Sequence, residues 1–335
     1  MKNRMRALGA AAIAGALALT ACSGGGSDAG TESGDQGAAQ ELTTLKVMTM
    51  GLTFDGALYG GIEQGFFEEE GLELELSIMA NPPAGLAAAQ SGQVDIAYAP
   101  TIPVLIAMNE GIELQVVASA NGLPPGAAND PNPEKFDDSG LFVGADSGIE
   151  SLEDLRGKTI AVPARKAVME IVTAIELENA GVGSDEIEWV ALDLASAVTA
   201  LDQGTIDAAG LVSPFTAQAR EAGAMKLASP TVSFFEEGAM AYWFAGSNTV
   251  ETKSEAMAAF QRAIAKSNAW ATEHPEEAIQ LGIDRTGVDL TVDQVGTPVW
   301  PVEVEIEDLN RANRKLAQYG FLPAELDLSG FVFSG

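Results

Sequence analysis

The stretch Gly92-Gln93-Val94-Asp95-Ile96-Ala97 recurs 112 residues later as Gly204-Thr205-Ile206-Asp207-Ala208-Ala209. Each copy follows an Ala-rich helical stretch, opens an apolar strand and is followed by a proline, Pro100 or Pro214. A repeat of this length predicts two similar α/β lobes of roughly a hundred residues each. The two aspartates are interpreted as turn and strand-entry residues, with contact to a ligand as the alternative.

Around this repeat, short apolar segments alternate with helical ones, which is typical of α/β units on largely parallel sheets. Strands are predicted at 45–50, 72–79, 94–98, 114–118, 141–145, 159–162, 187–191, 206–211 and 240–245, and helices at 56–69, 86–90, 102–109 and 168–179. The proline-rich segment 121–139 is predicted to be a surface loop. Beyond residue 249 the chain is predicted to be mainly helical, with a last helix at 306–319 that Gly320 ends.

The amino-terminal segment predicts export. Three basic residues precede an uncharged apolar run at 7–19, which is too short to span a bilayer. The run leads into Cys22, and the segment resembles a bacterial lipoprotein signal with its lipobox. The resemblance implies cleavage after residue 21 and lipidation of Cys22, with an ordinary secretory signal as the alternative. Residues 22–43 lack large apolar side chains, apart from the last few, and are predicted to form a flexible tether.

Charge and cysteine content exclude several kinds of site. The 335-residue chain has 18 Lys and Arg against 48 Asp and Glu, a net charge of -30, and removal of residues 1–21 would take away only basic residues. Such a surface argues against nucleic-acid binding and against electrostatic adhesion to anionic lipid. Because Cys22 is the only cysteine, a disulfide framework and a cysteine nucleophile are excluded. The sequence predicts neither a cofactor nor a metal site.

Three further segments carry a family resemblance. GFFEEEGL at 65–72, GIESLEDLRGKTIAV at 148–162 and HPEEA at 274–278 resemble segments of the solute-binding proteins of ABC importers. The branch is the one that binds nitrate, sulfonates, taurine and thiamine pyrimidine precursors. The resemblance covers about residues 45–325, and its most specific part is the DLRGK run at 154–158.

This resemblance implies a type II periplasmic-binding-protein fold, in which two α/β lobes are joined by two crossover strands. The first lobe would comprise 44–141 and 245–335, and the second lobe 142–244. The crossings would fall near 141–145 and 242–246. Two connections permit a hinge closure around the solute, and a permease then recognises the closed form without any bond being made or broken.

The ligand site is predicted from the rule that ligands bind beyond the carboxyl ends of strands in open α/β sheets. The rule selects residues in loops of both lobes and beside the second crossover. They are Thr53, Phe54, Asp55, Asn81, Pro100, Thr101, Ser119, Asn121, Arg165, Lys166, Ser213, Phe215, Tyr242 and Trp243.

Arg165 and Lys166 are the sharpest signal in this set, because two adjacent cations at a helix N-terminus are disfavoured by the helix dipole unless an anion binds there. Pairing with carboxylates such as Glu170 is the alternative. The family often has small or hydroxyl residues in this loop, so the pair is a departure. Asp55 could accept a hydrogen bond from an amino group or cap a helix, and Asn81 is equally ambiguous.

The aromatic members Phe54, Phe215, Tyr242 and Trp243 could stack on a planar ligand or serve only in core packing. His274 precedes Pro275 and two glutamates, which indicates a helix start rather than a catalytic or metal-binding role.

The sequence therefore predicts a lipid-anchored, monomeric substrate-binding protein at the extracytoplasmic face of the cell membrane. Its partners would be a small-molecule ligand and an ABC permease with its ATPase, and it would not be an enzyme. A sulfonate, nitrate-like or other small anion is favoured, with a neutral heterocycle such as a thiamine pyrimidine precursor as the alternative. A pyrimidine-forming enzyme, whose cysteine-rich motif the chain lacks, and an interaction module that has lost transport are the competing classes.

Overall fold

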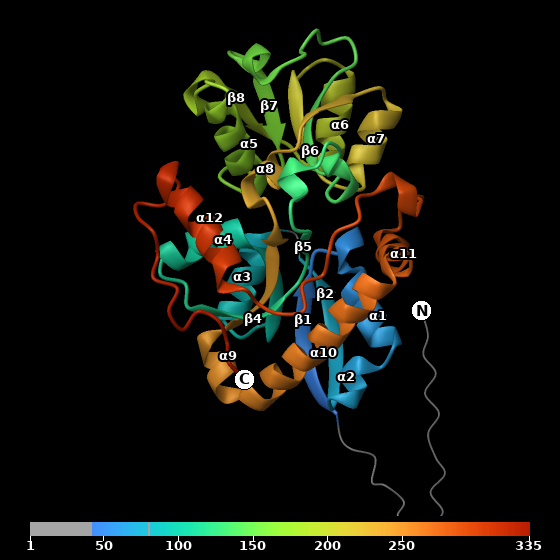
Figure 1. Ribbon diagram of the computed structural model, residues 1–335, viewed down its shortest axis with the longest axis vertical. Helices are drawn as coiled ribbons and strands as arrows, with labels where there is room; N and C mark the ends of the chain where they lie inside the picture. Colours follow the sequence, from blue (N-terminus) through green and yellow to red (C-terminus); the bar gives the residue numbers. More distant parts are fainter. Residues whose placement is uncertain (1–41, 80) are drawn as a thin grey trace, which may run out of the picture. The chain divides into compact units, whose positions relative to one another are not determined.

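The computed structural model describes residues 42–79 and 81–335. The predicted signal segment, Cys22 and the predicted tether up to residue 41 lie outside the described residues. Glu41–Gly335 forms one compact unit, whose helices and strands are labelled in Figure 1.

The first sheet has five strands in the order β2-β1-β3-β12-β4. They are β1 (Thr43–Thr49), β2 (Leu72–Ile78), β3 (Ile96–Pro100), β4 (Leu114–Ser119) and β12 (Ala241–Gly246). Strand β1 is parallel to β2 and β3, whereas β12 is antiparallel to β3 and β4. The connecting helices are α1 (Gly56–Glu63), α2 (Phe66–Glu69), α3 (Pro82–Gln90) and α4 (Thr101–Asn109).

The second sheet also has five strands, in the order β10-β6-β9-β7-β8. They are β6 (Gly140–Val143), β7 (Thr159–Val162), β8 (Glu188–Ala191), β9 (Ala208–Leu211) and β10 (Met225–Ala228). Its helices are α5 (Val168–Asn179), α6 (Leu194–Asp202) and α7 (Phe215–Glu221). Apolar residues of β6, β7 and β9 are buried on both faces, as expected for strands covered by helices on two sides.

The two sheets repeat one arrangement. In each, the strand that the repeated sequence opens, β3 or β9, is parallel to β1 or β7 and lies beside one antiparallel strand, β12 or β6. The repeat in the sequence is therefore a repeat in the structure.

Each repeated aspartate ties its strand to the neighbouring one. Asp95 Oδ2 accepts the backbone N–H of Lys46 at 3.0 Å, and Asp207 Oδ2 accepts that of Thr159 at 2.9 Å. Their interpretation as strand-entry residues is confirmed.

Two short strands join the halves of the chain. β5 (Gly122–Leu123) pairs antiparallel with β11 (Gly238–Ala239), so the two connections between the sheets lie side by side here. The crossings predicted at 141–145 and 242–246 fall instead at β6 and β12, which lie within the two sheets and begin just after these connections. Residues 121–139 are not simply a surface loop, since they contain β5 and the buried side chains of Leu123 and Asp138.

The carboxyl-terminal part is mainly helical, as predicted. α8 (Pro230–Phe235) precedes β11, and α9 (Ser247–Thr252), α10 (Ser254–Glu273), α11 (Pro275–Thr286) and α12 (Ile306–Gln318) follow β12. His274 is the N-cap residue of α11, and Gly320 has a φ of +74° just past α12. Both predicted helix boundaries are therefore confirmed.

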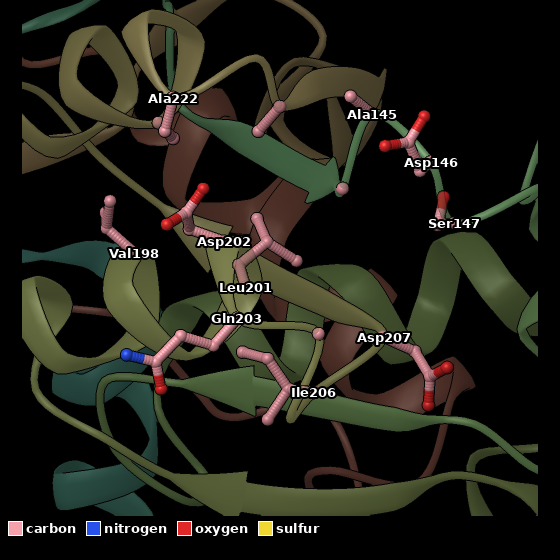
Figure 2. A pocket seen from close by; sticks show the side chains of 14 residues that line it. Ala145, Asp146, Ser147, Val198, Leu201, Asp202, Gln203, Ile206, Asp207 and Ala222 are labelled. Atoms are coloured by element: carbon pink, nitrogen blue, oxygen red, sulfur yellow. The ribbon is translucent and has the colours of Figure 1, made fainter.

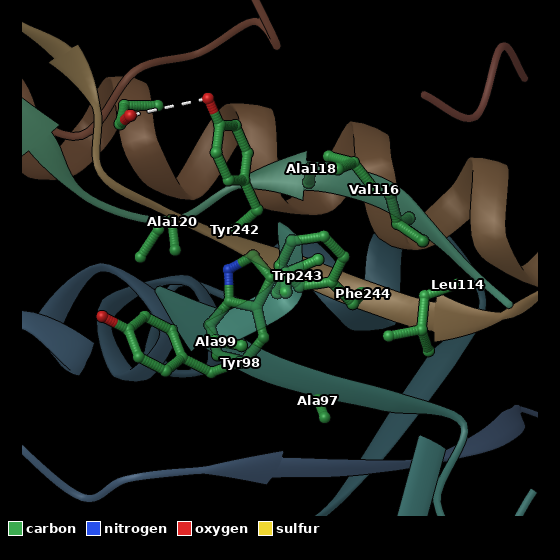
Figure 3. Packing of buried hydrophobic residues seen from close by; sticks show 14 of the residues in the cluster. Ala97, Tyr98, Ala99, Leu114, Val116, Ala118, Ala120, Tyr242, Trp243 and Phe244 are labelled. Atoms are coloured by element: carbon green, nitrogen blue, oxygen red, sulfur yellow. Dashed lines mark hydrogen bonds between the residues drawn. The ribbon is translucent and has the colours of Figure 1, made fainter. Parts of the chain in front are cut away.

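Strand β12 carries three large aromatic side chains of the core (Figure 3). Tyr242 and Phe244 lie on one face of the sheet, and Trp243 lies on the other against Tyr98 and Phe260. Tyr242 and Phe244 are fully buried and Trp243 is 3% exposed, so core packing is the main role of all three.

Close contact between α11 and the turn after β1 makes a stability test possible. A Cβ at Gly282 would lie 1.9 Å from the carbonyl oxygen of Thr53. Gly282→Ala therefore forces α11 away from the backbone of the turn after β1. We expect the free energy of unfolding to fall by about 1–3 kcal/mol, measured by urea denaturation.

Gly144→Ala is the matched control, because its added Cβ meets only the Leu201 carbonyl oxygen, at 3.5 Å. Equal stability of the two variants would contradict the packing of α11 described above.

Candidate functional site

The topology brings the carboxyl ends of the parallel strands of both sheets to the connections between the lobes. The chain enters β12 at Ala241, opposite Pro100 at the end of β3, and enters β6 at Gly140, opposite Leu211 at the end of β9. Both strand ends therefore lie at the end of their sheet next to the connecting segments. This is where a ligand between two lobes would bind.

At the first sheet, aromatic side chains gather at this edge. Phe54 stacks on Tyr98, with 5.1 Å between ring centroids, and Tyr98 meets Trp243 edge-on at 5.7 Å. Tyr98 was not selected from the sequence, although its place two residues before Pro100 on a strand pointing to the site was a usable signal. Together the three rings form an aromatic cluster near the ends of β1 and β3, in which Phe54 and Tyr98 are stacked and Trp243 stands edge-on to Tyr98.

Several predicted polar residues at this edge hold the backbone together. Tyr98 Oη donates to Asn121 Oδ1 at 3.0 Å, Thr101 Oγ1 donates to the Met240 carbonyl at 2.8 Å, and Ser119 Oγ donates to the Glu303 carbonyl at 2.7 Å. These hydrogen bonds fasten β3, β4 and β12 to one another and to the carboxyl-terminal segment. The structure therefore gives Thr101, Ser119 and Asn121 an internal role.

Asp55 differs from these residues because one of its oxygens is unused. It is 2% exposed and Oδ2 accepts the Leu52 N–H at 3.0 Å, while Oδ1 and the buried Thr49 Oγ1 have no hydrogen-bond partner in residues 42–79 and 81–335. Burial raises the pKa of Asp55 to about 6, although the nearby Thr49 hydroxyl and two backbone amides lower it in part. The side chain is not solvated and makes no cap hydrogen bond to α1, but by accepting the Leu52 N–H it caps the short 3-10 helix Thr53–Asp55, so the helix-capping alternative is confirmed in this form.

Two carboxylates flank the phenol of Tyr98. Burial raises the pKa of Tyr98 well above its usual value, and the charges of Asp55 and Asp137 raise it further. Asp137 belongs to the connection that enters β6, so acidic groups approach Tyr98 from the first sheet and from the connecting segment. Both acidic groups therefore disfavour ionisation of the Tyr98 phenol.

At the second sheet, the predicted cations are not equivalent. Arg165 Nε lies 2.7 Å from Glu170 Oε2, and its Nη1 donates to the Trp189 carbonyl at 3.1 Å. The structure thus shows Arg165 in the pairing that was the alternative to anion binding. Lys166 has a φ of +57°, is exposed and makes no ion pair within the described part of the chain.

The remaining predicted residues lie in separate loops. Ser213 and Phe215 follow β9, next to β7 in the sheet, and the buried Ser213 Oγ has no hydrogen-bond partner in the described residues. Asn81 is exposed and its Oδ1 accepts the Ala84 N–H at 3.0 Å, so it caps α3. Among the described residues, no side-chain hydrogen bond joins Asn81 to another predicted ligand residue.

A segment that the sequence analysis did not select crosses this region. Trp300 Nε1 donates to the Phe54 carbonyl at 3.1 Å, Val299 exchanges backbone hydrogen bonds with Gly122, and the Thr297 N–H donates to the Lys135 carbonyl at 2.8 Å. Trp300 packs in an apolar cluster that includes Ala217 of α7. Residues 295–303 therefore contact the first sheet, the connection and the second lobe.

A cavity of about 340 Å³ lies elsewhere, at the end of the second sheet opposite the connections (Figure 2). It is lined by residues that follow β6 and precede β9, including Asp146, Asp202 and Asp207. Asp207 is already paired with Lys158 at 3.1 Å. None of the predicted ligand residues lines this cavity.

Across residues 42–79 and 81–335, no helix combines the length and apolarity that crossing a membrane requires. The same described residues contain no group of three or more His, Cys, Asp or Glu side chains that could hold a metal ion.

The curated relatives of this chain are all named as binding proteins. The NMT1/THI5 like family model matches residues 55–278. Formylaminopyrimidine-binding protein of Halalkalibacterium halodurans is 26% identical over 67% of this chain and 64% of its own length. A Bacillus subtilis protein named as aliphatic sulfonates-binding is 23% identical over 88% of this chain and 86% of its own. The chain spans 64% of the length of the Brucella binding proteins that it also matches.

Among solved structures, the periplasmic aliphatic sulphonate binding protein SsuA of Escherichia coli has a TM-score of 0.67 at 18% identity, covering 86% of this chain and 96% of that one. At this identity the similarity establishes the fold, with two α/β lobes joined by two crossover strands. Because the family model covers more than half of the sequence, the chain belongs to the NMT1/THI5-like family and has the periplasmic-binding-protein fold.

Proposed function

We propose that this chain is the substrate-binding protein of an ABC importer, held at the extracytoplasmic face of the cell membrane by a lipid on Cys22. The observation that carries the proposal is the family match over 55–278 on a fold whose two sheets point their carboxyl edges at the same connections. The permease and its ATPase are the proposed partners, and the protein acts as a monomer.

Function in this proposal requires no chemical step. A solute that contacts both lobes has higher affinity for the closed form than for the open one, and this difference shifts the equilibrium toward closure. The side-by-side strands β5 and β11 are the natural hinge. The family's named relatives are binding proteins, which supports a receptor rather than an enzyme.

A small anion, such as a sulfonate, is the first candidate solute. The sulfonates-binding relative matches almost the whole chain. Because Glu170 engages Arg165, Lys166 is the cation of the predicted pair that can meet an anion. It immediately precedes Ala167, the N-cap residue of α5, where the helix N-terminus adds to the attraction.

A neutral heterocycle with amino groups is the second candidate, and specific observations favour it. One relative is named as formylaminopyrimidine-binding. The half-buried ring of Phe54, stacked on Tyr98, offers an aromatic face at the carboxyl edge of the first sheet. Stacking on aromatic rings suits a planar solute.

A thermal-shift panel on residues 41–335 tests the receptor function. Sulfonates, nitrate, aminopyrimidines and amino acids are compared at equal concentration. A ligand at 100 times its Kd should stabilise the protein by about 2.7 kcal/mol, which raises the Tm by several degrees. Turnover of any of these solutes, or the absence of a shift with all of them, would contradict the proposal.

Lys166→Ala and Arg165→Ala separate the two cations. We expect Lys166→Ala to weaken anion binding about three- to tenfold by isothermal titration calorimetry, since one partly exposed charge contributes about 1 kcal/mol. Arg165→Ala should instead lower stability, because Glu170 is buried and loses its partner. Loss of anion binding in Arg165→Ala alone would assign the site to Arg165.

The lipid anchor is tested by Cys22→Ser. Wild-type protein should incorporate radiolabelled palmitate and sediment with membranes, because acyl chains hold a protein firmly at a bilayer. The variant should incorporate no label and leave the membrane fraction. Ser23→Ala serves as the control and should behave as wild type. Membrane retention of unlabelled Cys22→Ser would overturn the assignment.

A further inference from the structure

We propose, building on the receptor function above, that Trp300 is a positioning residue for solute binding. Its indole N–H holds the turn that carries Phe54, so the ring of Phe54 is already fixed in place when a planar solute arrives. In this role Trp300 acts through Phe54 and makes no contact with the solute itself. The protein would then bind ring-bearing solutes better than it would with a mobile Phe54.

The turn that carries Phe54 has few hydrogen bonds of its own. It is a 3-10 helix of three residues, Thr53–Asp55, between β1 and α1. Helices of this kind have poorer hydrogen-bond geometry than α-helices. Phe54 is only half-buried, although its ring stacks on Tyr98 with 5.1 Å between the centroids. The direction in which the ring points therefore depends on contacts with segments that lie elsewhere in the chain.

Trp300 supplies a directional contact to this turn. Its Nε1–H donates to the carbonyl oxygen of Phe54 at 3.1 Å, although the two residues are 246 positions apart. Trp300 is 2% exposed, and a hydrogen bond in such surroundings is stronger than one in water. The bond fixes the peptide plane that follows the Cα of Phe54. It thereby limits the directions in which the Phe54 side chain can leave the backbone.

The segment that carries Trp300 is itself held firmly on both sides. Val299 exchanges two backbone hydrogen bonds with Gly122 of β5, at 2.8 and 3.1 Å. Asn268 of α10, which is 1% exposed, donates through Nδ2 to the carbonyl of Pro301 at 2.7 Å. The indole can therefore support the turn instead of moving with it.

A second tryptophan shows that core packing alone does not require this hydrogen bond. Trp270 packs against the same apolar cluster as Trp300, and its ring stacks on His274 with 5.3 Å between the centroids. In residues 42–79 and 81–335, Nε1 of Trp270 donates no hydrogen bond to the turn that carries Phe54. The two indoles thus separate packing in the cluster from positioning of Phe54.

The test uses two sulfonates that differ by a ring, benzenesulfonate and ethanesulfonate, together with 2-aminopyrimidine. Binding to the full chain in mild detergent is measured by isothermal titration calorimetry. Trp300→Phe keeps an aromatic side chain in the cluster but removes the N–H donor. It should weaken binding of the two ring-bearing probes about three- to tenfold, because a side chain that must be ordered on binding lowers affinity. Ethanesulfonate should bind as it does to the wild type.

A double-mutant cycle shows whether Trp300 acts through Phe54. Phe54→Leu removes the ring and should weaken binding of benzenesulfonate and 2-aminopyrimidine. Adding Trp300→Phe to Phe54→Leu should then change these affinities little, because the effects of two residues that act together do not add. Trp270→Phe is the matched control, since it removes an indole from the same cluster, and it should leave the three affinities unchanged.

Hydrogen exchange in the wild type gives a second measurement, which decides the question if Trp300→Phe does not fold. The indole N–H signal of Trp300 is followed by NMR and assigned by elimination with single Trp→Phe variants at the other three tryptophans. Bound benzenesulfonate should slow exchange of this N–H, because a ring packed on Phe54 steadies the carbonyl that accepts it. Bound ethanesulfonate should not.

The outcomes distinguish this inference from the receptor function. Equal losses for benzenesulfonate and ethanesulfonate in Trp300→Phe, additive losses in the cycle, or wild-type affinities in Trp300→Phe overturn the positioning role and leave the receptor function intact. The same is true if ethanesulfonate alone binds, or if benzenesulfonate leaves the exchange of the indole N–H unchanged. No binding of these probes or of any panel solute to the wild type refutes the receptor function itself, and this inference with it.

Discussion

The antiparallel pairing of β12 between β3 and β4 is the constraint on which the rest of the structure depends. Along the chain, β12 follows the whole second lobe and then joins the first sheet. β6 follows the first connection and joins the second sheet. Each sheet is thus completed by a strand that begins at a connection. Because these strands run antiparallel to their neighbours, the carboxyl ends of β1, β3, β7 and β9 must lie at the connections. The location of the proposed site at these strand ends follows from strand direction.

Packing then decides which polar and charged side chains at this end of the sheets already have partners within the protein and which remain available to a ligand. Asn121, Ser119 and Thr101 use their side chains to tie strands together, and Arg165 is held by Glu170. What remains is the aromatic cluster, the buried carboxyl group of Asp55 and the exposed Lys166. A site with these groups is mixed in character, since it offers aromatic rings, a buried carboxyl group and a cation on the other sheet. Such a combination suits a solute with an acidic or planar part.

Prediction from sequence worked best where a local pattern has a single structural outcome. The strand-entry aspartates were read correctly because their turn chemistry is local, and α5 was predicted at its observed limits because its apolar face is periodic. β10 was missed because its four residues are half exposed and include Lys226. The crossing of residues 295–303 was missed because its hydrogen bonds, such as that from Trp300 to Phe54, join residues far apart in the chain.

By itself, the sequence determined the class of protein: two α/β repeats, a chain with a single cysteine, a strongly acidic composition and the segments shared with the family. These features are local or compositional, so one chain is enough to read them. Only the tertiary structure decided which predicted ligand residues remain free to bind. Whether Arg165 meets a ligand or Glu170, and whether Asp55 is solvated or buried beneath α11, depends on distances between distant segments. Such distances arise from packing, and no pattern along the chain encodes them locally.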